Sequence, residues 1–126
     1  PTPVGRLGKV AVVFPGSGNQ FPGMGRELSA HFPAVLHRQQ AENRRLRNQY
    51  APEKFWADAV PPDTTAKQML FGQVSLGTLT ADLLRLLKVP ADALLGLSLG
   101  ESAGLFGLRV WPGRDEMLSR IEKSSL

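Results

Sequence analysis

The sequence predicts an α/β domain with a parallel sheet, and three observations support this class. Residues 9–14 and 93–97 are short, continuously apolar runs, a pattern typical of strands buried on both faces of a parallel sheet. Helical patterns separate these two runs and another follows the second, which is the order of a βαβ arrangement. The chain has 126 residues, 42% of them hydrophobic, which suits one domain with a core of its own.

The first strand stands between two segments rich in glycine and proline. Residues 1–8 are predicted to be a linker, so the domain is assigned to residues 9–126. Residues 15–20 form a turn-rich loop whose glycine spacing matches neither a Walker motif nor a dinucleotide-binding motif. Because the ends of neighbouring strands meet in α/β folds, we expect this loop to lie beside the end of the second strand.

Three helices are predicted between the strands. Residues 24–32 have helical spacing, and residues 34–48 are so highly charged that an exposed helix is expected there. Residues 66–88 are mostly apolar, and either Thr64 or Thr65 is expected to cap the start of this helix. A helix this apolar is expected near the centre of the domain rather than on its surface.

A serine lies at the junction between the second strand and the next helix. Ser98 is the centre of a Gly96-x-Ser98-x-Gly100 motif. A predicted strand precedes the motif and a predicted helix, residues 101–108, follows it, which is the setting of a nucleophile elbow. The sharp turn exposes the serine Oγ and crowds the residues two positions away, so glycine is needed there. The N–H of Leu99 is then placed to donate to an oxyanion.

The Gly-x-Ser-x-Gly pattern alone also occurs by chance in turns, and this chain has 13 glycines. The flanking strand and helix favour the functional interpretation. A serine nucleophile needs a base, yet His31 and His37 both precede Ser98 and lie in a charged helical stretch typical of surface histidines. The chain therefore offers no base for Ser98, and we expect it to be part of something longer.

The composition argues against several classes of function. The chain has no cysteine and only two histidines, so no disulfide, no metal site and no bound cofactor is expected. The net charge is +4, but the basic residues within 38–54 lack interleaved aromatics, so they predict a solvated helix face and no nucleic-acid surface. No apolar run approaches about 20 residues and no signal peptide opens the chain, which fits a cytoplasmic protein without a membrane partner.

Two segments of the chain resemble one family of enzymes. Residues 13–20, Val-Phe-Pro-Gly-Ser-Gly-Asn-Gln, and the Gly-Met-Gly at 23–25 are similar to the Phe-Pro-Gly-Gln-Gly-x-Gln…Gly-Met-Gly opening of one group of acyltransferases. That group comprises malonyl-CoA:acyl-carrier-protein transacylases and the acyltransferase domains of fatty-acid and polyketide synthases. Residues 96–101, Gly-Leu-Ser-Leu-Gly-Glu, resemble the Gly-His-Ser-x-Gly-Glu motif of the same family. The details look most like the acyltransferases of polyunsaturated-fatty-acid-type synthases.

The resemblance implies ping-pong acyl transfer from coenzyme A to an acyl carrier protein. Ser98 would attack the acyl thioester while the backbone N–H groups of Ser17 and Leu99 hold the oxyanion. The phosphopantetheine thiol of the carrier protein would then collect the acyl group. Gln73 matches a glutamine that lines the site in the family. The positive net charge would favour these anionic partners.

The fold that the resemblance implies is the large, α/β-hydrolase-like subdomain of an acyltransferase, here incomplete. In the family the histidine base lies far downstream, which places it beyond Leu126. A small ferredoxin-like subdomain of the family is also absent from this chain. We therefore expect the isolated chain to be inactive and to need neighbouring synthase domains or the missing C-terminal part of the same domain.

The chain departs from the family pattern at three positions. Ser17 replaces a glutamine, which matters little because the main-chain amide is the group used. Leu97 replaces the histidine before the nucleophile, which removes a polar contact from the substrate site. The arginine that binds a malonyl carboxylate falls at Lys123, in a predicted helix over 115–123, with Arg120 one turn earlier. Lysine pairs with a carboxylate without a bidentate fork, so malonyl and an uncharged acyl group both stay open as substrates.

Two other functions stay open beside acyl transfer. A serine esterase or thioesterase shares the elbow, although the loop over 14–20 and Glu101 favour transfer; hydrolysis of acyl-CoA without a carrier protein would indicate it. A non-catalytic fragment that docks onto a partner polypeptide would instead expose a large apolar face.

Overall fold

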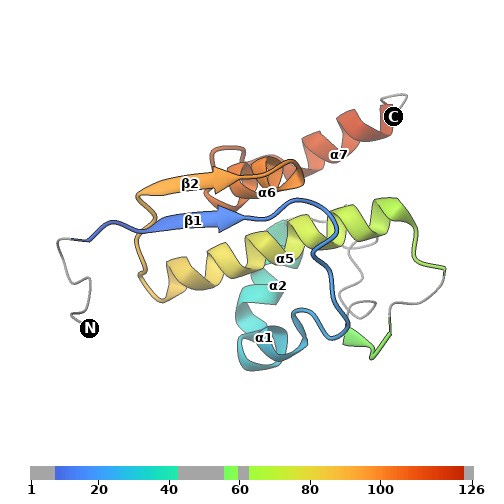
Figure 1. Ribbon diagram of the computed structural model, residues 1–126, viewed down its shortest axis with the longest axis horizontal. Coiled ribbons are helices and arrows are strands. Elements are labelled where there is room, and N and C mark those ends of the chain that lie inside the picture. Colours follow the sequence, from blue (N-terminus) through green and yellow to red (C-terminus); the bar gives the residue numbers. More distant parts are fainter. Residues whose placement is uncertain (1–7, 43–55, 60–62, 124–126) are drawn as a thin grey trace.

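The computed structural model describes residues 8–42, 56–59 and 63–123 as a small parallel sheet with helices packed beside it (Figure 1). The two strands and the helices lie where the sequence predicts them, with helix ends shifted by at most two residues where both ends are described. The predicted linker, apart from Gly8, lies outside the described residues. In chain order the elements are β1 (Ala11–Phe14), α1 (Arg26–His31), α2 (Pro33–Glu42), α5 (Ala66–Leu86), β2 (Ala93–Gly96), α6 (Leu99–Gly107) and α7 (Arg114–Lys123).

The two strands pair in parallel. Ala11 lies opposite Ala93, and Phe14 lies opposite Gly96. The ladder extends past the second strand, because the N–H of Leu97 donates to the carbonyl of Phe14 at 3.1 Å. Since parallel strands end at the same edge, the loop that follows β1 and the turn that follows β2 leave the sheet side by side.

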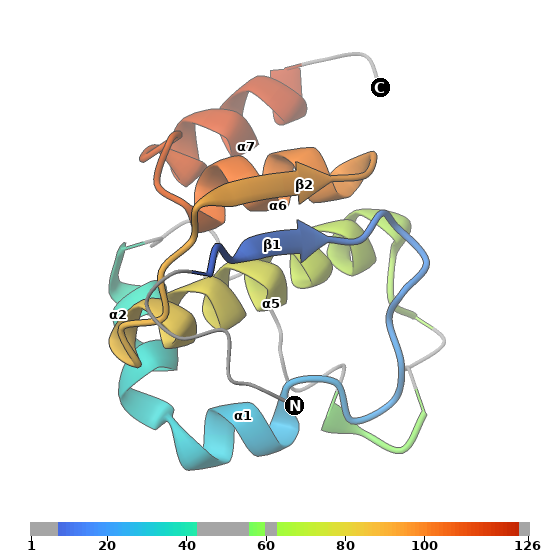
Figure 2. The ribbon, with the colours of Figure 1, turned by 60° about the vertical axis from the view of Figure 1, so that its left-hand side comes forward.

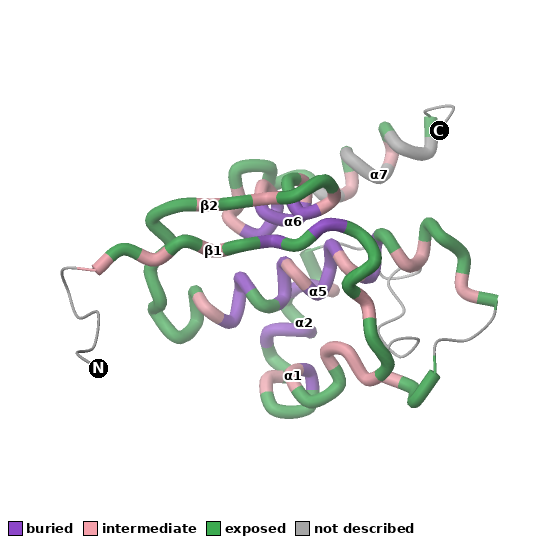
Figure 3. Tube along the Cα trace, viewed as in Figure 1, coloured by how far each residue is buried: buried purple, intermediate pink, exposed green. Residues whose placement is uncertain are grey.

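One face of this sheet is covered and the other is open within the described residues. Val12, Phe14 and Leu94 belong to a hydrophobic cluster that also contains side chains of α5 and α6. On the opposite face Val13 and Leu95 are 65% and 60% exposed (Figure 3). The prediction that both strand faces are buried is therefore wrong for the described part of the chain. Successive side chains alternate between the faces, and the helices described here cover only one of them.

Helix α5 lies between two hydrophobic clusters, which confirms its predicted central position (Figure 2). One cluster joins it to the sheet and α6, and the other joins it to α1 and α2. Thr65 begins the helix, because its Oγ1 accepts from Gln68 N at 3.2 Å while Gln68 Oε1 accepts from Thr65 N at 2.9 Å. The buried apolar members of the two clusters are Phe14, Val74, Ala81, Ala103 and Phe106 on one side and Val35, Leu36, Phe71, Leu76 and Leu79 on the other.

Helix α2 is more deeply packed than its charged sequence predicts. Val35 and Leu36 are buried in the cluster against α5, and Gln39 Nε2 donates to Ser75 O at 2.7 Å. The prediction of an exposed helix therefore holds for most positions of α2 and is wrong for the face that Val35, Leu36 and Gln39 form. Two apolar side chains and one paired amide within a turn are enough to pack this face of the helix against α5. The many charged residues around them make such a short apolar face hard to predict from the sequence. Residues 43–48, the rest of the predicted helix, lie outside the described residues.

A buried carboxylate joins α5 to the turn after α6. The side chain of Asp82 is 7% exposed and contacts Arg85 Nη1 at 2.6 Å and Arg109 Nη2 at 3.2 Å. Arg109 also pairs with Glu42 at the end of α2 at 2.6 Å, and Arg85 donates to the carbonyl of Gly107 at 2.8 Å. The network therefore connects three helices through two guanidinium groups.

Asp82→Ala is expected to lower the free energy of unfolding by about 2 kcal/mol, because Arg85 loses its carboxylate partner and Arg109 keeps one of its two, Glu42. Urea unfolding measures this loss. Glu116→Gln is the matched control, since Glu116 pairs with Arg120 on the exposed surface of α7 and should change stability by less than about 0.5 kcal/mol. An equal effect of the two variants would contradict a stabilising role for the Asp82 network.

The described residues offer neither a membrane-spanning helix nor a metal-binding cluster. None of the helices there combines the length and the apolar character that a membrane span requires. The same residues contain no group of three or more histidine, aspartate or glutamate side chains arranged to hold a metal ion.

Candidate functional site

Ser98 lies at the point where β2 ends and α6 begins. Its backbone has φ 54° and ψ −118°, a conformation with positive φ that side-chain-bearing residues rarely adopt. Such strained residues persist only where the surrounding structure holds them, and they cluster at functional sites. Ser98 is exposed, and its hydroxyl does not cap α6. The strained turn therefore presents a serine whose Oγ is not used for helix capping.

The two glycines of the motif are required by close backbone contacts. A Cβ on Gly96 would lie 2.6 Å from both N and Cα of Glu101. A Cβ on Gly100 would lie 2.0 Å from the carbonyl oxygen of Phe14 and 2.7 Å from that of Pro15. Both contacts involve backbone atoms, which cannot turn aside as a flexible side chain can. The first glycine lets the turn close on itself, and the second lets α6 approach the end of β1.

The loop that follows β1 lies against this turn, as the order of the strands predicts. Gly16 is buried, and a Cβ on it would lie 3.1 Å from the carbonyl oxygen of Leu97 and 3.5 Å from the Cβ of Ser98. Two segments some 80 positions apart in the sequence thus meet at the candidate nucleophile. Ser17, the next residue in the loop, is exposed.

Two backbone N–H groups near Ser98 are available to a ligand. At the start of α6, Gly100 N donates to Leu97 O at 2.8 Å and Glu101 N donates to Ser98 O at 3.0 Å. The N–H groups of Leu99 and Ser17 donate to no acceptor within residues 8–42, 56–59 and 63–123. The positive end of the α6 dipole adds to the attraction for negative charge here. These two donors are the ones that the sequence predicts for an oxyanion.

Gln73 reaches from α5 to the loop after β1. Its side-chain amide contacts that of Gln20. In the orientation in which its oxygen faces the loop, that oxygen lies 2.9 Å from Gln20 N and 3.2 Å from Asn19 N and accepts from both. The sequence predicts Gln73 as a substrate-binding residue; its contacts in the described chain hold the loop, and it also lines the cavity beside it.

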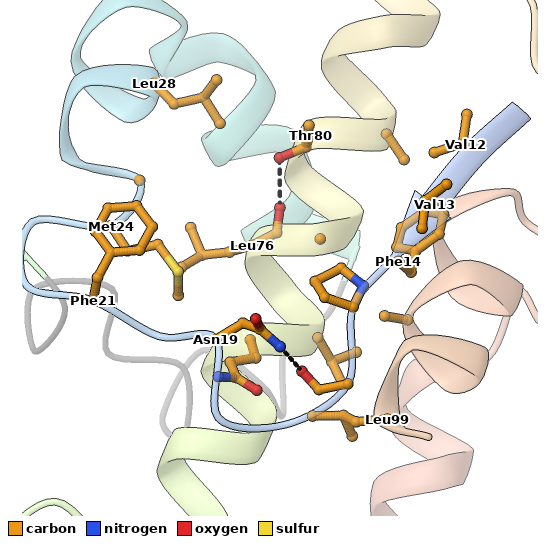
Figure 4. A pocket seen from close by; sticks show the side chains of 18 residues that line it. Val12, Val13, Phe14, Asn19, Phe21, Met24, Leu28, Leu76, Thr80 and Leu99 are labelled. Carbon is orange, nitrogen blue, oxygen red and sulfur yellow. Dashed lines mark hydrogen bonds between the residues drawn. The ribbon is translucent and has the colours of Figure 1, made fainter. Parts of the chain in front are cut away.

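An apolar cavity of about 380 Å³ opens between β1, α5 and the segment that leads into α1 (Figure 4). Leu99 and Asn19 lie at one end of it and Leu28 lies towards the other. Gly16 and Leu99, the neighbours of Ser98 in space and in sequence, both line it. Its lining contains no charged side chain among the described residues, and the polar ones are Asn19, Gln73 and Thr80.

The other predicted substrate-binding residues are placed differently. Leu97 lies at the elbow and is 71% exposed. Arg120 and Lys123 are exposed on α7, where the guanidinium of Arg120 pairs with Glu116 at 2.7 Å. Neither cation lines the apolar cavity or contacts the elbow through a hydrogen bond or ion pair in the described part of the chain. Their predicted role with a carboxylate stays a prediction.

The two histidines lie away from the serine. His31 ends α1 and His37 lies on α2, and both are exposed. These helices pack on the side of α5 opposite to β2 and α6, as Figures 1 and 2 both show. The described residues therefore bring no imidazole to Ser98, in agreement with the absence of a candidate base in the sequence.

One residue of the site escaped the sequence analysis. The side-chain amide of Asn19 donates to the carbonyl of Gly16 at 2.8 Å, in the loop that touches Ser98. A signal for it exists in the sequence, because asparagine side chains often bond to backbone groups a few positions away in turns. The pattern does not say which carbonyl is bound.

Comparison with known proteins finds a similarity to a polyketide synthase. The chain is 38% identical over 107 residues to the polyketide synthase GfsA of Streptomyces halstedii. That match covers 75% of this chain and 1% of GfsA, so the chain spans a very small part of this much longer relative. No family model matches the chain, and no solved structure matches it. The chain is therefore related to a region of a polyketide synthase.

Proposed function

We propose that this chain is the nucleophile-bearing part of an acyltransferase domain in a polyketide or fatty-acid synthase, with the α/β-hydrolase-like fold of that family. The observation that carries the proposal is the strained Ser98, which has a φ of 54°, is exposed and lies beside the Gly16 loop. The parallel pairing of β1 and β2 and the similarity to a polyketide synthase support it. An acyl carrier protein and acyl-CoA are the partners proposed, by resemblance to the family.

The reaction proceeds in two substitutions. In the first, Ser98 Oγ attacks the thioester carbonyl, an O–C bond forms, the C–S bond breaks, and coenzyme A leaves as its thiol with the serine proton. In the second, the phosphopantetheine thiol of the carrier attacks the acyl-serine, an S–C bond forms, the O–C bond to Ser98 breaks, and the thiol proton passes to Ser98 Oγ. The N–H groups of Ser17 and Leu99 stabilise the oxyanion in both steps. The described residues supply no base, so the proton carrier comes from outside them.

Measurement of intact mass under denaturing conditions tests this proposal. The full-length protein is incubated with acetyl-CoA, butyryl-CoA or malonyl-CoA, and peptide mapping locates any adduct. An acyl adduct on Ser98 that a carrier-protein thiol removes supports transfer. Release of the adduct to water at the same rate with and without carrier protein would favour the esterase or thioesterase alternative. A protein that never acquires an adduct would overturn both.

The acyl group proposed is uncharged. The cavity that touches Gly16 and Leu99 has no charged side chain in its described lining, and Arg120 and Lys123 lie outside it. An unpaired carboxylate among apolar side chains is strongly disfavoured, whereas each buried methylene stabilises the bound ligand.

Butyryl-CoA is therefore expected to acylate Ser98 about tenfold faster than malonyl-CoA at equal subsaturating concentration, a difference typical of pocket discrimination. Single-turnover acylation measured by mass gives the two rates, with acetyl-CoA as the short uncharged control. Faster acylation by malonyl-CoA would contradict the uncharged substrate and would restore a role for Arg120 or Lys123.

Docking without catalysis is a second candidate function, and the open sheet face favours it. Val13, Leu95 and Leu97 are each at least 60% exposed, while parallel sheets are ordinarily covered on both faces. One comparison separates the two functions. If the chain only docks, Leu95→Lys would stop product formation by the synthase and Ser98→Ala would not. If it transfers acyl groups, Ser98→Ala alone is enough to stop it.

A further inference from the structure

We infer that Asn19 is a positioning residue that sets the direction of the Ser17 N–H toward the oxyanion. The inference rests on the proposed acyl transfer at Ser98 and adds to it a side chain that the sequence analysis did not include. Asn19 acts on the backbone of the loop, and no contact between Asn19 and the substrate is needed.

The direction follows from one hydrogen bond and the planarity of one peptide. Asn19 Nδ2 donates to the carbonyl oxygen of Gly16 at 2.8 Å (Figure 4). That carbonyl and the N–H of Ser17 belong to the same peptide unit, and no described peptide bond is cis. In a trans peptide the C=O and the N–H point in opposite directions. A side chain that fixes the Gly16 carbonyl therefore also fixes the Ser17 N–H on the other side of the plane.

Within residues 8–42, 56–59 and 63–123, no backbone N–H donates to the Gly16 carbonyl in place of Asn19. A turn over residues 16–19 would ordinarily be closed by Asn19 N donating to Gly16 O. Here Asn19 N and Gln20 N instead face the side-chain amide of Gln73, whose oxygen lies 3.2 Å and 2.9 Å from them in the orientation in which it faces the loop. Gly18 has φ 89°, and a Cβ added to it would meet open space, so no side-chain packing at Gly18 restrains the loop. The side-chain amide takes the place of the missing backbone donor.

The anchor at Gln73 makes the arrangement rigid at its other end. Gln73 belongs to α5, whose neighbouring residues Val74 and Leu76 are buried in the two clusters. The loop is therefore held from α5 through the backbone of Asn19 and Gln20 and then, through the Asn19 amide, at the peptide beside Ser98. A donor at the carbonyl also polarises the peptide, which strengthens its N–H as a donor to a developing negative charge.

Asn19→Asp tests the inference, since it keeps the shape and replaces the donor with an acceptor that repels the Gly16 carbonyl. In the full-length protein we expect single-turnover acylation of Ser98 by butyryl-CoA to slow by about 10- to 100-fold, within the range for loss of one oxyanion donor or less. Gln40→Glu on α2 makes the same amide-to-carboxylate change away from the site and should leave the rate unchanged.

A structural effect is separated from a positioning effect by two binding probes. Butylboronic acid forms a tetrahedral adduct with a nucleophilic serine and places an oxygen where the oxyanion would be, and the thioether S-butyl-CoA resembles only the unreacted ligand. Asn19→Asp should lower the affinity for butylboronic acid by the same factor by which it slows acylation. The affinity for S-butyl-CoA and the Tm should stay unchanged.

The possible results have distinct meanings. The inference is overturned, while the proposed function stands, if the Asn19→Asp variant is acylated at the wild-type rate. It is likewise overturned if the variant loses affinity for both probes by the same factor. Wild-type protein that is never acylated at Ser98 overturns the proposed function itself. Rate and boronic-acid affinity that fall together, with S-butyl-CoA unaffected, support the positioning role.

Discussion

Ser98→Ala is expected to abolish acyl loading of the full-length protein, with a fall of at least about a thousandfold in the rate of acylation. The acyl-enzyme needs an oxygen nucleophile at this position, and loss of the nucleophile in serine enzymes removes almost all covalent catalysis. The alanine keeps the strained turn, because its Cβ occupies the place of the serine Cβ. Intact mass after incubation with butyryl-CoA gives the result directly.

A second serine provides the control. Ser102 lies one turn further along α6 and is only partly buried, so Ser102→Ala should load like the wild type. The circular dichroism spectrum and the Tm of each variant should stay close to those of the wild type, as for an ordinary surface substitution. Acyl loading of the Ser98→Ala protein at the wild-type rate would remove the elbow from the reaction and would leave the docking function as the better explanation of the exposed sheet face.

Gly100→Ala is expected to destabilise the chain by about 3 kcal/mol or more, although alanine normally favours a helix over glycine by up to about 1 kcal/mol. The added Cβ would lie 2.0 Å from the carbonyl oxygen of Phe14, which is backbone and cannot rotate away. Relief of the contact requires α6 to move from the end of β1, and that movement separates Leu99 from the Gly16 loop. Acyl loading should therefore fall together with stability, measured by urea unfolding and by mass.

Gly113→Ala is the matched control for that substitution. A Cβ on Gly113 would meet only the side chain of Glu116, at an ordinary 3.6 Å, so stability should change by less than about 0.5 kcal/mol. If Gly100→Ala were as stable as Gly113→Ala, the close approach of α6 to β1 would not exist in solution. The proposed oxyanion site, which depends on that approach, would then lose its geometric basis.

Much of the backbone arrangement could be predicted from the sequence, because residue patterns within short segments determine where the strands and helices form. The apolar runs over 9–14 and 93–97 contain the two strands, which lie at Ala11–Phe14 and Ala93–Gly96, and the apolar stretch after Thr65 became the central helix. The glycine spacing around Ser98 predicted a tight turn. A sharp turn from a strand into a helix needs residues without a Cβ on both sides of its apex, and the two glycines meet that need.

Other features could not be predicted, since they depend on side chains brought together from distant parts of the chain. The charged sequence of α2 did not predict that Val35, Leu36 and Gln39 are buried. Their burial results from packing against α5. The expected burial of both strand faces failed, because alternation fixes which side chains share a face but not what covers it. Gln73 was predicted as a ligand to substrate, and its contacts with the loop backbone are visible only in the fold.

By itself the sequence determined the order of strands and helices, the serine at the turn and the glycines beside it, because each follows from interactions within a few residues. It also predicted that the Gly16 loop lies beside the Ser98 turn, because parallel strands end at the same edge of a sheet. The tertiary structure alone decided that Asn19 binds the Gly16 carbonyl and that an apolar cavity opens beside the turn. The cavity needs contacts between segments some 80 positions apart, such as Gly16 and Leu99. Such contacts are set by packing around α5 and by the parallel pairing of β1 with β2, which no local pattern records.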